Sequence, residues 1–328
     1  MNFNFFKKEK EIIEKGLEKI ALRKSKNNDK NHTTNNDNID ETKNIDNEEK
    51  NKIDIPEEKT IDIKIPKIEV KLPEPEYTEN IDRNYIILEK DNAYGISHKG
   101  NRANNEDYIL IKKIKDIYLL AVADGIGGHN AGYVASEMAI DVLKNIISEK
   151  YNENLSFEEI KELLNEVYNT AHKGIKENAV RDKEGMGTTL TTAIIKGNKC
   201  IIANCGDSRA YLIRDGEIVF RTKDHSLVQA LIDAGHITEE EAMHHPMKNI
   251  ITSALGLDDF KVDIYDLDLK DEDILLLSSD GLHDYVSKED ILKTVNDNDS
   301  PKDIVEELLK TALKETRDNV SIIVYKKQ

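Results

Sequence analysis

The sequence predicts an α+β domain, built from layers of antiparallel strands and grouped helices, behind a polar N-terminal extension. Two observations support this fold class. Short apolar runs follow one another with tight turns such as KGNK and RDGE between them, and these turns join antiparallel neighbours. Longer stretches place apolar residues at helical spacing. Because the helices are grouped and the strands pair antiparallel, we expect a layered α+β domain and not a doubly wound one.

Each element has its own local signal. Helices are predicted over 133–148, 157–177 and 301–315. The second begins at a capping box formed by Ser156 and Glu159, and the third has Ser300 as its N-cap with Pro301 in the first turn. The apolar runs predict strands over 85–88, 108–112, 117–123, 188–196, 199–205, 210–214, 217–220, 273–279 and 320–325.

Residues 1–84 differ in composition from the rest of the chain, and we expect them to be largely disordered. Residues 3–24 carry apolar side chains at roughly helical spacing, which fits a membrane-surface or partner-binding helix; the near balance of Glu and Lys favours a solvated helix instead. Residues 25–52 are Asn, Asp, Lys and Glu with almost nothing to bury. Residues 61–72 alternate Ile or Val with charge, but Pro66 and Pro73 restrict such a strand to a sheet edge or a tether.

The charge and cysteine content limit the classes of partner. The 328 residues include 47 Lys and Arg against 64 Asp and Glu, a net charge of −17, which disfavours a nucleic-acid partner. Cys200 and Cys205 have an odd separation on one expected strand, so they point to opposite faces and do not pair, which fits a reducing compartment. No apolar run reaches the length of a membrane span, and no signal peptide is recognisable, so we expect a cytoplasmic protein without a transmembrane segment.

Four aspartates stand at the ends of apolar strands. Asp124 and Asp280 each end a run and precede a glycine, Asp207 follows a run, and Asp318 stands just before the last run. Each alone could merely open a turn. If all four converge, however, their repulsion requires cations, and all-oxygen ligands select Mg²⁺ or Mn²⁺. Gly125 would leave room for its carbonyl to reach a metal ion.

One of the cations near these acids in the sequence is Arg102, which belongs to the stretch GNRANNED. Arg102 precedes Glu106 and Asp107, and a guanidinium beside a metal cluster can grip two phosphoryl oxygens. Arg102 could equally form a structural ion pair with Glu106 or Asp107. The glycine-rich stretch 123–132 leads into a helix, as phosphate-binding loops do, but it matches no nucleotide-binding pattern.

Six motifs follow one another along the chain. In order, they are GNRANNED, VADGIGGHNAG, GMGTT, GDSRAYL, SSDGL and RDNVS. Together they resemble the metal-dependent protein phosphatases of type 2C, in their bacterial branch. The resemblance covers roughly residues 85–328 and does not extend to residues 1–84. It implies a four-layer αββα sandwich with a binuclear Mn²⁺ or Mg²⁺ centre, and it makes 222–252 a flap over the cleft, with Thr238 and Glu241 as the capping box of one flap helix.

The resemblance also implies metal ligands. Asp124 would bridge two metal ions, and the Gly125 carbonyl would bind one of them. Asp280 and Asp318 would complete the second site. Asp207 would belong to a third, weaker site.

The remaining implied roles concern substrate and water. Arg102 would hold the substrate phosphate, while Glu106 and Asp107 would act mainly through metal-bound waters. Some family members have a histidine as proposed general acid where this chain has Ile126; His129 is the nearest alternative, although it could simply shape its loop.

The implied function is metal-dependent hydrolysis of phosphoserine and phosphothreonine in proteins by a metal-bridged water, without a covalent intermediate. The expected partners are phosphorylated proteins, including a Ser/Thr kinase and its targets, and we expect a monomer. Two alternatives stay open at this point. One is an inactive scaffold of the same fold that binds phosphoproteins, and the other is a phosphohydrolase that acts on small phosphoesters.

Overall fold

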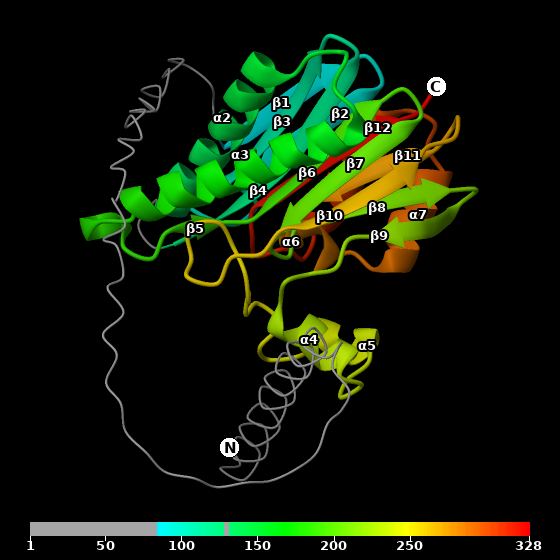
Figure 1. Ribbon diagram of the computed structural model, residues 1–328. Helices are drawn as coiled ribbons and strands as arrows, with labels where there is room; N and C mark the ends of the chain where they lie inside the picture. Colours follow the sequence, from blue (N-terminus) through cyan, green and yellow to red (C-terminus); the bar gives the residue numbers. More distant parts are fainter. Residues whose placement is uncertain (1–83, 128–130) are drawn as a thin grey trace, which may run out of the picture. The chain divides into compact units, whose positions relative to one another are not determined.

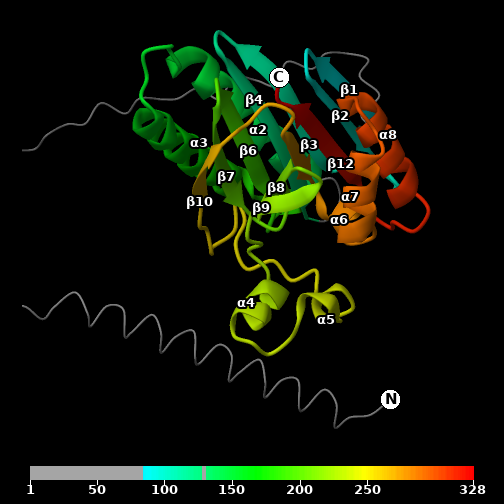
Figure 2. The ribbon, with the colours of Figure 1, turned by 90° about the vertical axis from the view of Figure 1, so that its right-hand side faces the viewer.

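The computed structural model describes residues 84–127 and 131–328. Two antiparallel sheets lie face to face, and helices cover the outer face of each, as the two views in Figures 1 and 2 show. The predicted α+β class and the αββα sandwich are therefore confirmed. The predictions for residues 1–83 lie outside the described residues. No helix in the described part of the chain is long and apolar enough to cross a membrane.

The first sheet has the strand order β1-β2-β12-β11-β8-β9, and the second has the order β10-β7-β6-β4-β3, with the short β5 paired to β4. Strands far apart in sequence, such as β2 and β12, are therefore neighbours. The strands are β1 (Tyr85–Lys90), β2 (Ala93–His98), β3 (Asp107–Ile114), β4 (Ile117–Ile126), β5 (Gly187–Thr188), β6 (Leu190–Lys196), β7 (Lys199–Cys205), β8 (Arg209–Arg214), β9 (Glu217–Arg221), β10 (Asp263–Asp268), β11 (Ile274–Ser278) and β12 (Val320–Lys326).

Helices α2 and α3 cover the second sheet, while α7 and α8 cover the first, on opposite sides of the sandwich in Figure 2. The predicted cap of α3 is present: the Ser156 hydroxyl accepts from the Glu159 amide, and the Glu159 carboxylate accepts from the Ser156 amide at 2.8 Å. The helices are α2 (Ala131–Lys150), α3 (Phe157–Asn178), α4 (Leu227–Asp233), α5 (Glu239–Met243), α6 (Asp280–His283), α7 (Lys288–Asn296) and α8 (Pro301–Ala312), with a 3₁₀ turn at Arg181–Lys183.

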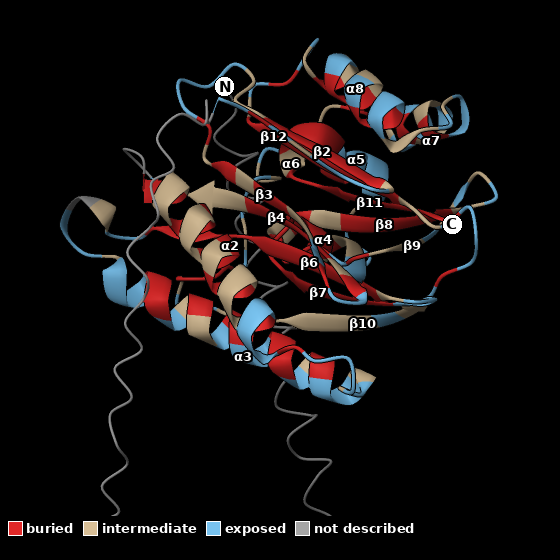
Figure 3. Ribbon diagram, turned by 90° about the horizontal axis from the view of Figure 1, so that it is seen from above, coloured by how far each residue is buried: buried red, intermediate tan, exposed pale blue. Residues whose placement is uncertain are grey.

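Three apolar layers hold the sandwich together: one under α2 and α3, one under α7 and α8, and one between the sheets. Figure 3 shows the buried residues concentrated on the strands and on the inward sides of the helices. Cys200 lies in the layer between the sheets and Cys205 in the layer under α2 and α3, so the prediction of opposite faces is confirmed. Both thiols are unpaired.

Residues 222–252, here called the flap, leave the sandwich after β9 and return before β10. An isolated bridge between Ser226 and Ile251 closes the base of the flap. The flap contains α4 and α5, which Figure 1 shows beside the ends of the sheets. The predicted capping box of Thr238 and Glu241 starts α5.

Candidate active site

The strand ends of both sheets bring five aspartates to one region. Asp107 and Asp124 are direct cross-strand neighbours on β3 and β4. Asp280 follows β11, and Asp318 precedes β12, its antiparallel partner, so these two lie at the same edge of the first sheet. Asp207 stands between β7 and β8, which belong to different sheets. The predicted convergence of the acids is therefore what the fold produces.

The acids repel one another and are wholly or partly buried: Asp107 and Asp207 are buried, while Asp124, Asp280 and Asp318 are half-buried. Burial raises the pKa of Asp124 well above its usual range, and the charges of Asp107, Asp280, Asp207 and Asp318 raise it further. Burial followed by the charges of Asp207 and Asp318 does the same to the pKa of Asp280. Burial also raises the pKa of Asp107 and that of Asp207 to about 7. A cation among these carboxylates would offset both the burial of their negative charges and the repulsion between them.

The region also contains acceptor atoms without donors. Among the described residues, three buried side-chain oxygens have no hydrogen-bond partner, namely Oδ1 of Asp107, Asp207 and Asp280. Such atoms are costly unless something satisfies them. As the side chains stand, no group of three or more His, Cys, Asp or Glu residues in the described ranges is placed so that it could hold a metal ion. Carboxylate oxygens without a nitrogen or sulfur donor nevertheless fit a hard cation such as Mg²⁺ or Mn²⁺.

Two glycines allow the close approach of these segments. A Cβ atom on Gly125 would lie 2.2 Å from the carbonyl oxygen of Gly132, so β4 and the start of α2 could not pack as they do. A Cβ atom on Gly281 would lie 1.8 Å from the carbonyl oxygen of Asn319. This contact brings α6, which begins with Asp280, directly against the segment that carries Asp318.

Arg102 lies at the edge of the acidic cluster and is exposed. Its Nη2 donates to Asp318 Oδ2 at 2.7 Å, and its Nε donates to the carbonyl oxygen of Arg317. The alternative considered from sequence, an ion pair with Glu106 or Asp107, is therefore wrong, since the actual partner is 216 residues away. Glu106 is half-buried, and burial raises its pKa although Arg102 opposes the shift.

Two residues that the sequence did not single out hold this edge together. The Ser279 hydroxyl donates to Asp107 Oδ2 at 2.8 Å and thereby fixes one carboxylate oxygen. The Asn319 amide donates to the carbonyl oxygens of Lys99 and Asn104, and its Oδ1 accepts from the Glu106 amide. Asn319 therefore fastens the loop that carries Arg102. Its place beside Asp318 was the only sequence signal for this role.

The histidines contribute little to the cluster. His129 lies outside the described residues. Ile126 ends β4 and has no proton to donate. His283 is buried in α6, where its Nδ1 lies 3.0 Å from the Ser278 hydroxyl, and burial lowers its pKa well below the usual range. His244 and His245 lie on the flap, as predicted.

Known proteins are similar to this chain in sequence. The sequence pattern of the family described as "Protein phosphatase 2C" matches residues 94–320. The chain is 42% identical over 200 residues to the serine/threonine phosphatase stp of Listeria monocytogenes, a match that covers 59% of this chain and 79% of that protein. It is 39% identical over 196 residues to the serine/threonine protein phosphatase PstP of Mycobacterium tuberculosis, covering 59% of this chain and 36% of that one.

Solved structures agree with the sequence relatives. The serine/threonine phosphatase Stp1 from Staphylococcus aureus has 33% identity and a TM-score of 0.69, and the match covers 76% of this chain and all of that one. The catalytic domain of PstP, crystallised with two manganese ions, has 34% identity and a TM-score of 0.62, covering 73% of this chain and 98% of that one. Family pattern, relatives and fold coincide over the segment that carries the carboxylates, and this chain belongs to the protein phosphatase 2C family.

Proposed function

We propose that this chain removes phosphate from phosphoserine and phosphothreonine in proteins, in a reaction that depends on divalent metal ions. The observation that supports this function best is the set of buried aspartates whose raised pKa values and unpartnered oxygens call for cations, with Arg102 at their edge. It is a serine/threonine phosphatase, as its relatives are by name, and the related catalytic domain of PstP was crystallised with two manganese ions.

The aspartates are the proposed metal ligands. We assign Asp124, the Gly125 carbonyl, Asp280 and Asp318 as the groups that would hold a binuclear Mn²⁺ or Mg²⁺ centre, with Asp124 shared by its two sites and Asp280 with Asp318 completing the second. Asp207 stands between the two sheets and suits a third, weaker site. When bound, such ions supply an activated water and neutralise the charge that develops on the phosphoryl group.

The other residues bind substrate and orient water. Arg102 offers two parallel donors to phosphoryl oxygens, which favours the charge that develops in the transition state. Asp107 is held by Ser279, so one of its oxygens stays fixed while the other, which has no partner in the protein, is left to accept a hydrogen bond from water. Glu106 is assigned the same kind of water contact. Ile126 cannot protonate the leaving hydroxyl, so that proton has to come from water or from another group of the site.

The substrates are phosphorylated proteins. We propose that they include a Ser/Thr kinase and its targets, in the cytoplasm, and that the chain acts as a monomer. The test of function is phosphate release from a phosphothreonine peptide, p-nitrophenyl phosphate and a nucleotide, each with Mn²⁺ and with EDTA. The expected result is turnover of the peptide that EDTA abolishes. Turnover of the small esters alone would contradict the assignment, and binding of the peptide without turnover would indicate a scaffold.

A further inference from the structure

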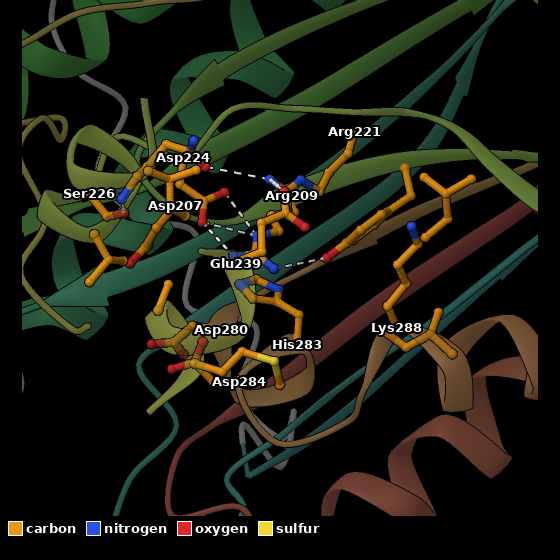
Figure 4. A pocket seen from close by; sticks show the side chains of 18 of the residues that line it. Asp207, Arg209, Arg221, Asp224, Ser226, Glu239, Asp280, His283, Asp284 and Lys288 are labelled. Carbon is orange, nitrogen blue, oxygen red and sulfur yellow. Dashed lines mark hydrogen bonds and ion pairs between the residues drawn. The ribbon is translucent and has the colours of Figure 1, made fainter. Parts of the chain in front are cut away.

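A cavity of about 340 Å³ lies between β9, the flap and the segment α6–α7. Asp207 and Asp280 line one part of it, so the cavity opens directly onto the proposed metal centre. Figure 4 shows Asp280 and Asp284 on one side and the pair of Asp224 with Arg209 on another. The volume falls within the range of ligand pockets, about 300–1,000 Å³. None of the roles assigned above uses the part of this cavity that extends beyond the aspartates.

The part of the cavity remote from the aspartates carries apolar side chains from four elements and one loop, among polar and charged residues such as Gln229 and Lys288. Part of it is open to solvent, since Val219 on β9 is 52% exposed and Met243 on α5 is 40% exposed. Apolar side chains gathered around an open cavity mark a binding site more often than chance exposure does. The apolar lining includes Val219, Val228, Ile232, Met243, Val286 and Ile291.

Three of the four Lys and Arg side chains in the lining, all but Lys288, are already paired with carboxylates of the protein. Arg209 pairs with Asp224 at 2.6 Å, and Lys248 pairs with Asp284 at 2.9 Å. Arg221 pairs with Glu239 at 3.2 Å. All of these partners line the same cavity. A charged ligand would have to compete with these pairs, whereas an apolar group only has to displace water.

We propose that this cavity is a specificity subsite for the phosphoprotein substrate, which binds a bulky apolar side chain located near the phosphorylated residue. The proposal rests on the proposed function. The occupant is the substrate's own chain, because Asp207 and Asp280 line the cavity, so a polypeptide whose phosphate reaches these carboxylates has its neighbouring residues close to the cavity. Burial of a Leu or Phe side chain then adds binding free energy.

The burial of the apolar side chain sets the size of the expected preference in kcat/KM. An apolar pocket that is filled rather than empty discriminates by roughly 10–200-fold in kcat/KM. The wall here is partly solvated, so the expected preference is about tenfold, at the lower end of that range. It should appear mainly in KM, because the side chain is bound equally in the ground and transition states.

The test uses the full chain with Mn²⁺ and a set of phosphothreonine peptides. Each peptide has Ser and Gly at its other positions and one Leu, placed in turn at each position flanking the phosphothreonine; an all-Ser/Gly peptide is the reference. The expected result is at least one position where Leu raises kcat/KM about tenfold over the reference. Equal rates at every position would overturn the subsite and leave the phosphatase intact. Absence of turnover of any peptide would instead overturn the proposed function.

Paired variants connect the preference to the cavity. Val219→Ser on β9 and Ile232→Ser on α4 should each reduce the Leu preference at least threefold, as the loss of part of an apolar contact implies. The preference is a ratio measured on one preparation, so a partly unfolded sample does not change it. Ile87→Ser is the matched control, since Ile87 is 46% exposed on β1, at the opposite edge of the same sheet. A preference that survives both cavity variants, or is lost equally in the control, would contradict the proposal.

The oligomeric state tests the alternative occupant, a second copy of this chain. Size-exclusion chromatography of the same samples should show no dimer that Val219→Ser disrupts. An enzyme without peptide preference whose dimer is lost in that variant would assign the cavity to self-association and overturn the subsite.

Discussion

At the scale of single residues, the Asp280 carboxylate should support turnover when metal is bound and lower the stability of the metal-free protein. One substitution can separate these two effects. This carboxylate is needed for the proposed metal centre, but without metal it is repelled by Asp207 and Asp318. Asp280→Asn should therefore retain less than about a tenth of wild-type kcat with Mn²⁺, since an amide supplies no charge to hold the ion. In EDTA the same variant should melt at a higher temperature than wild type, because one of the repelling charges is gone.

Asp284→Asn is the matched control for Asp280→Asn. It removes the same charge four residues further on, but Asp284 pairs with Lys248 of the flap at 2.9 Å. A partly exposed pair of this kind contributes little, so kcat should fall less than about threefold. An equal loss in both variants would contradict a specific ligand role for Asp280.

Arg102 gives the second prediction at this scale. Arg102→Ala should lower kcat/KM for a phosphothreonine peptide about 10–100-fold, the value of a hydrogen bond to a charged group, with kcat lowered as well as KM raised, because Arg102 is assigned to the charge of the transition state. Arg102→Lys should recover only part of this loss, since lysine keeps the charge but not the planar fork. Calorimetric titration should show that Mn²⁺ still binds to both variants. Lost metal binding with unchanged peptide kinetics would reverse the assignment, and would mean that Arg102 mainly orients Asp318.

At the scale of elements, the local signals in the sequence were sufficient to predict most of the strands and helices. The turn between β8 and β9 was predicted from RDGE, and Asp215 and Gly216 indeed have φ values of 50° and 80°, which the chemistry of Asp-Gly allows. The predicted strand 199–205 matches β7. In contrast, β2 was missed because Gly95 and Ser97 interrupt any apolar run. It is a strand because β1 and β12 pair with it on its two sides.

The candidate site was predictable only in part, for a related physical reason. Strand ends can be located from local sequence, so the aspartates could be predicted to converge. The partner of Arg102 and the contacts of Asn319 depend on segments more than 200 residues away, and no spacing rule reaches that far. The cavity beside the flap is likewise formed by four elements that meet only after folding.

The N-cap of α3 supplies a prediction that concerns stability alone. Ser156→Ala should lower the free energy of unfolding by about 1 kcal/mol, the usual value of an N-cap, because the amide of Glu159 loses its acceptor. Peptide kinetics should not change, since α3 packs on the second sheet through residues such as Leu164 and Tyr168, away from the cluster. Denaturant unfolding beside a kcat/KM assay checks both parts. Ser156→Asp, which preserves a cap acceptor, should keep most of the stability.

At the scale of the whole molecule, the activity should belong to residues 85–328. The family pattern matches residues 94–320, and the carboxylates, Arg102 and the flap all lie after residue 84. A chain that begins at residue 85 should therefore fold and keep at least about half of the wild-type kcat/KM, because no assigned group is removed. Circular dichroism and peptide turnover are the measurements. An insoluble or inactive product would show that residues 1–84 contribute to the domain.

The acidic cluster also couples the stability of the whole domain to pH, and Asp207 is where this is easiest to isolate. Its pKa is about 7 in the folded protein, against 3.8 for an ordinary aspartate, because of burial and then the charges of Asp224 and Asp284. Between these two values the folded, metal-free protein holds a proton that the unfolded chain releases. The contribution of Asp207 to the free energy of unfolding is therefore fully present below about pH 4 and is lost as the pH rises to about 7.

Asp207→Asn removes this pH-dependent contribution to stability. It should therefore change how the melting temperature depends on pH, which a uniform loss of stability would not do. In EDTA the variant should melt at a higher temperature than wild type at pH 7.5, and this difference in melting temperature should become smaller towards pH 5. One pKa unit corresponds to about 1.4 kcal/mol, and each kcal/mol moves the melting temperature of a domain this large by about 2–4 °C, so a gap of several degrees is expected. With saturating Mn²⁺ the order should reverse, because the wild-type carboxylate then binds a cation, and the variant should need more Mn²⁺ for full turnover. A variant that melts below wild type at every pH in EDTA and has an unchanged Mn²⁺ activation curve would show that Asp207 only shapes its turn.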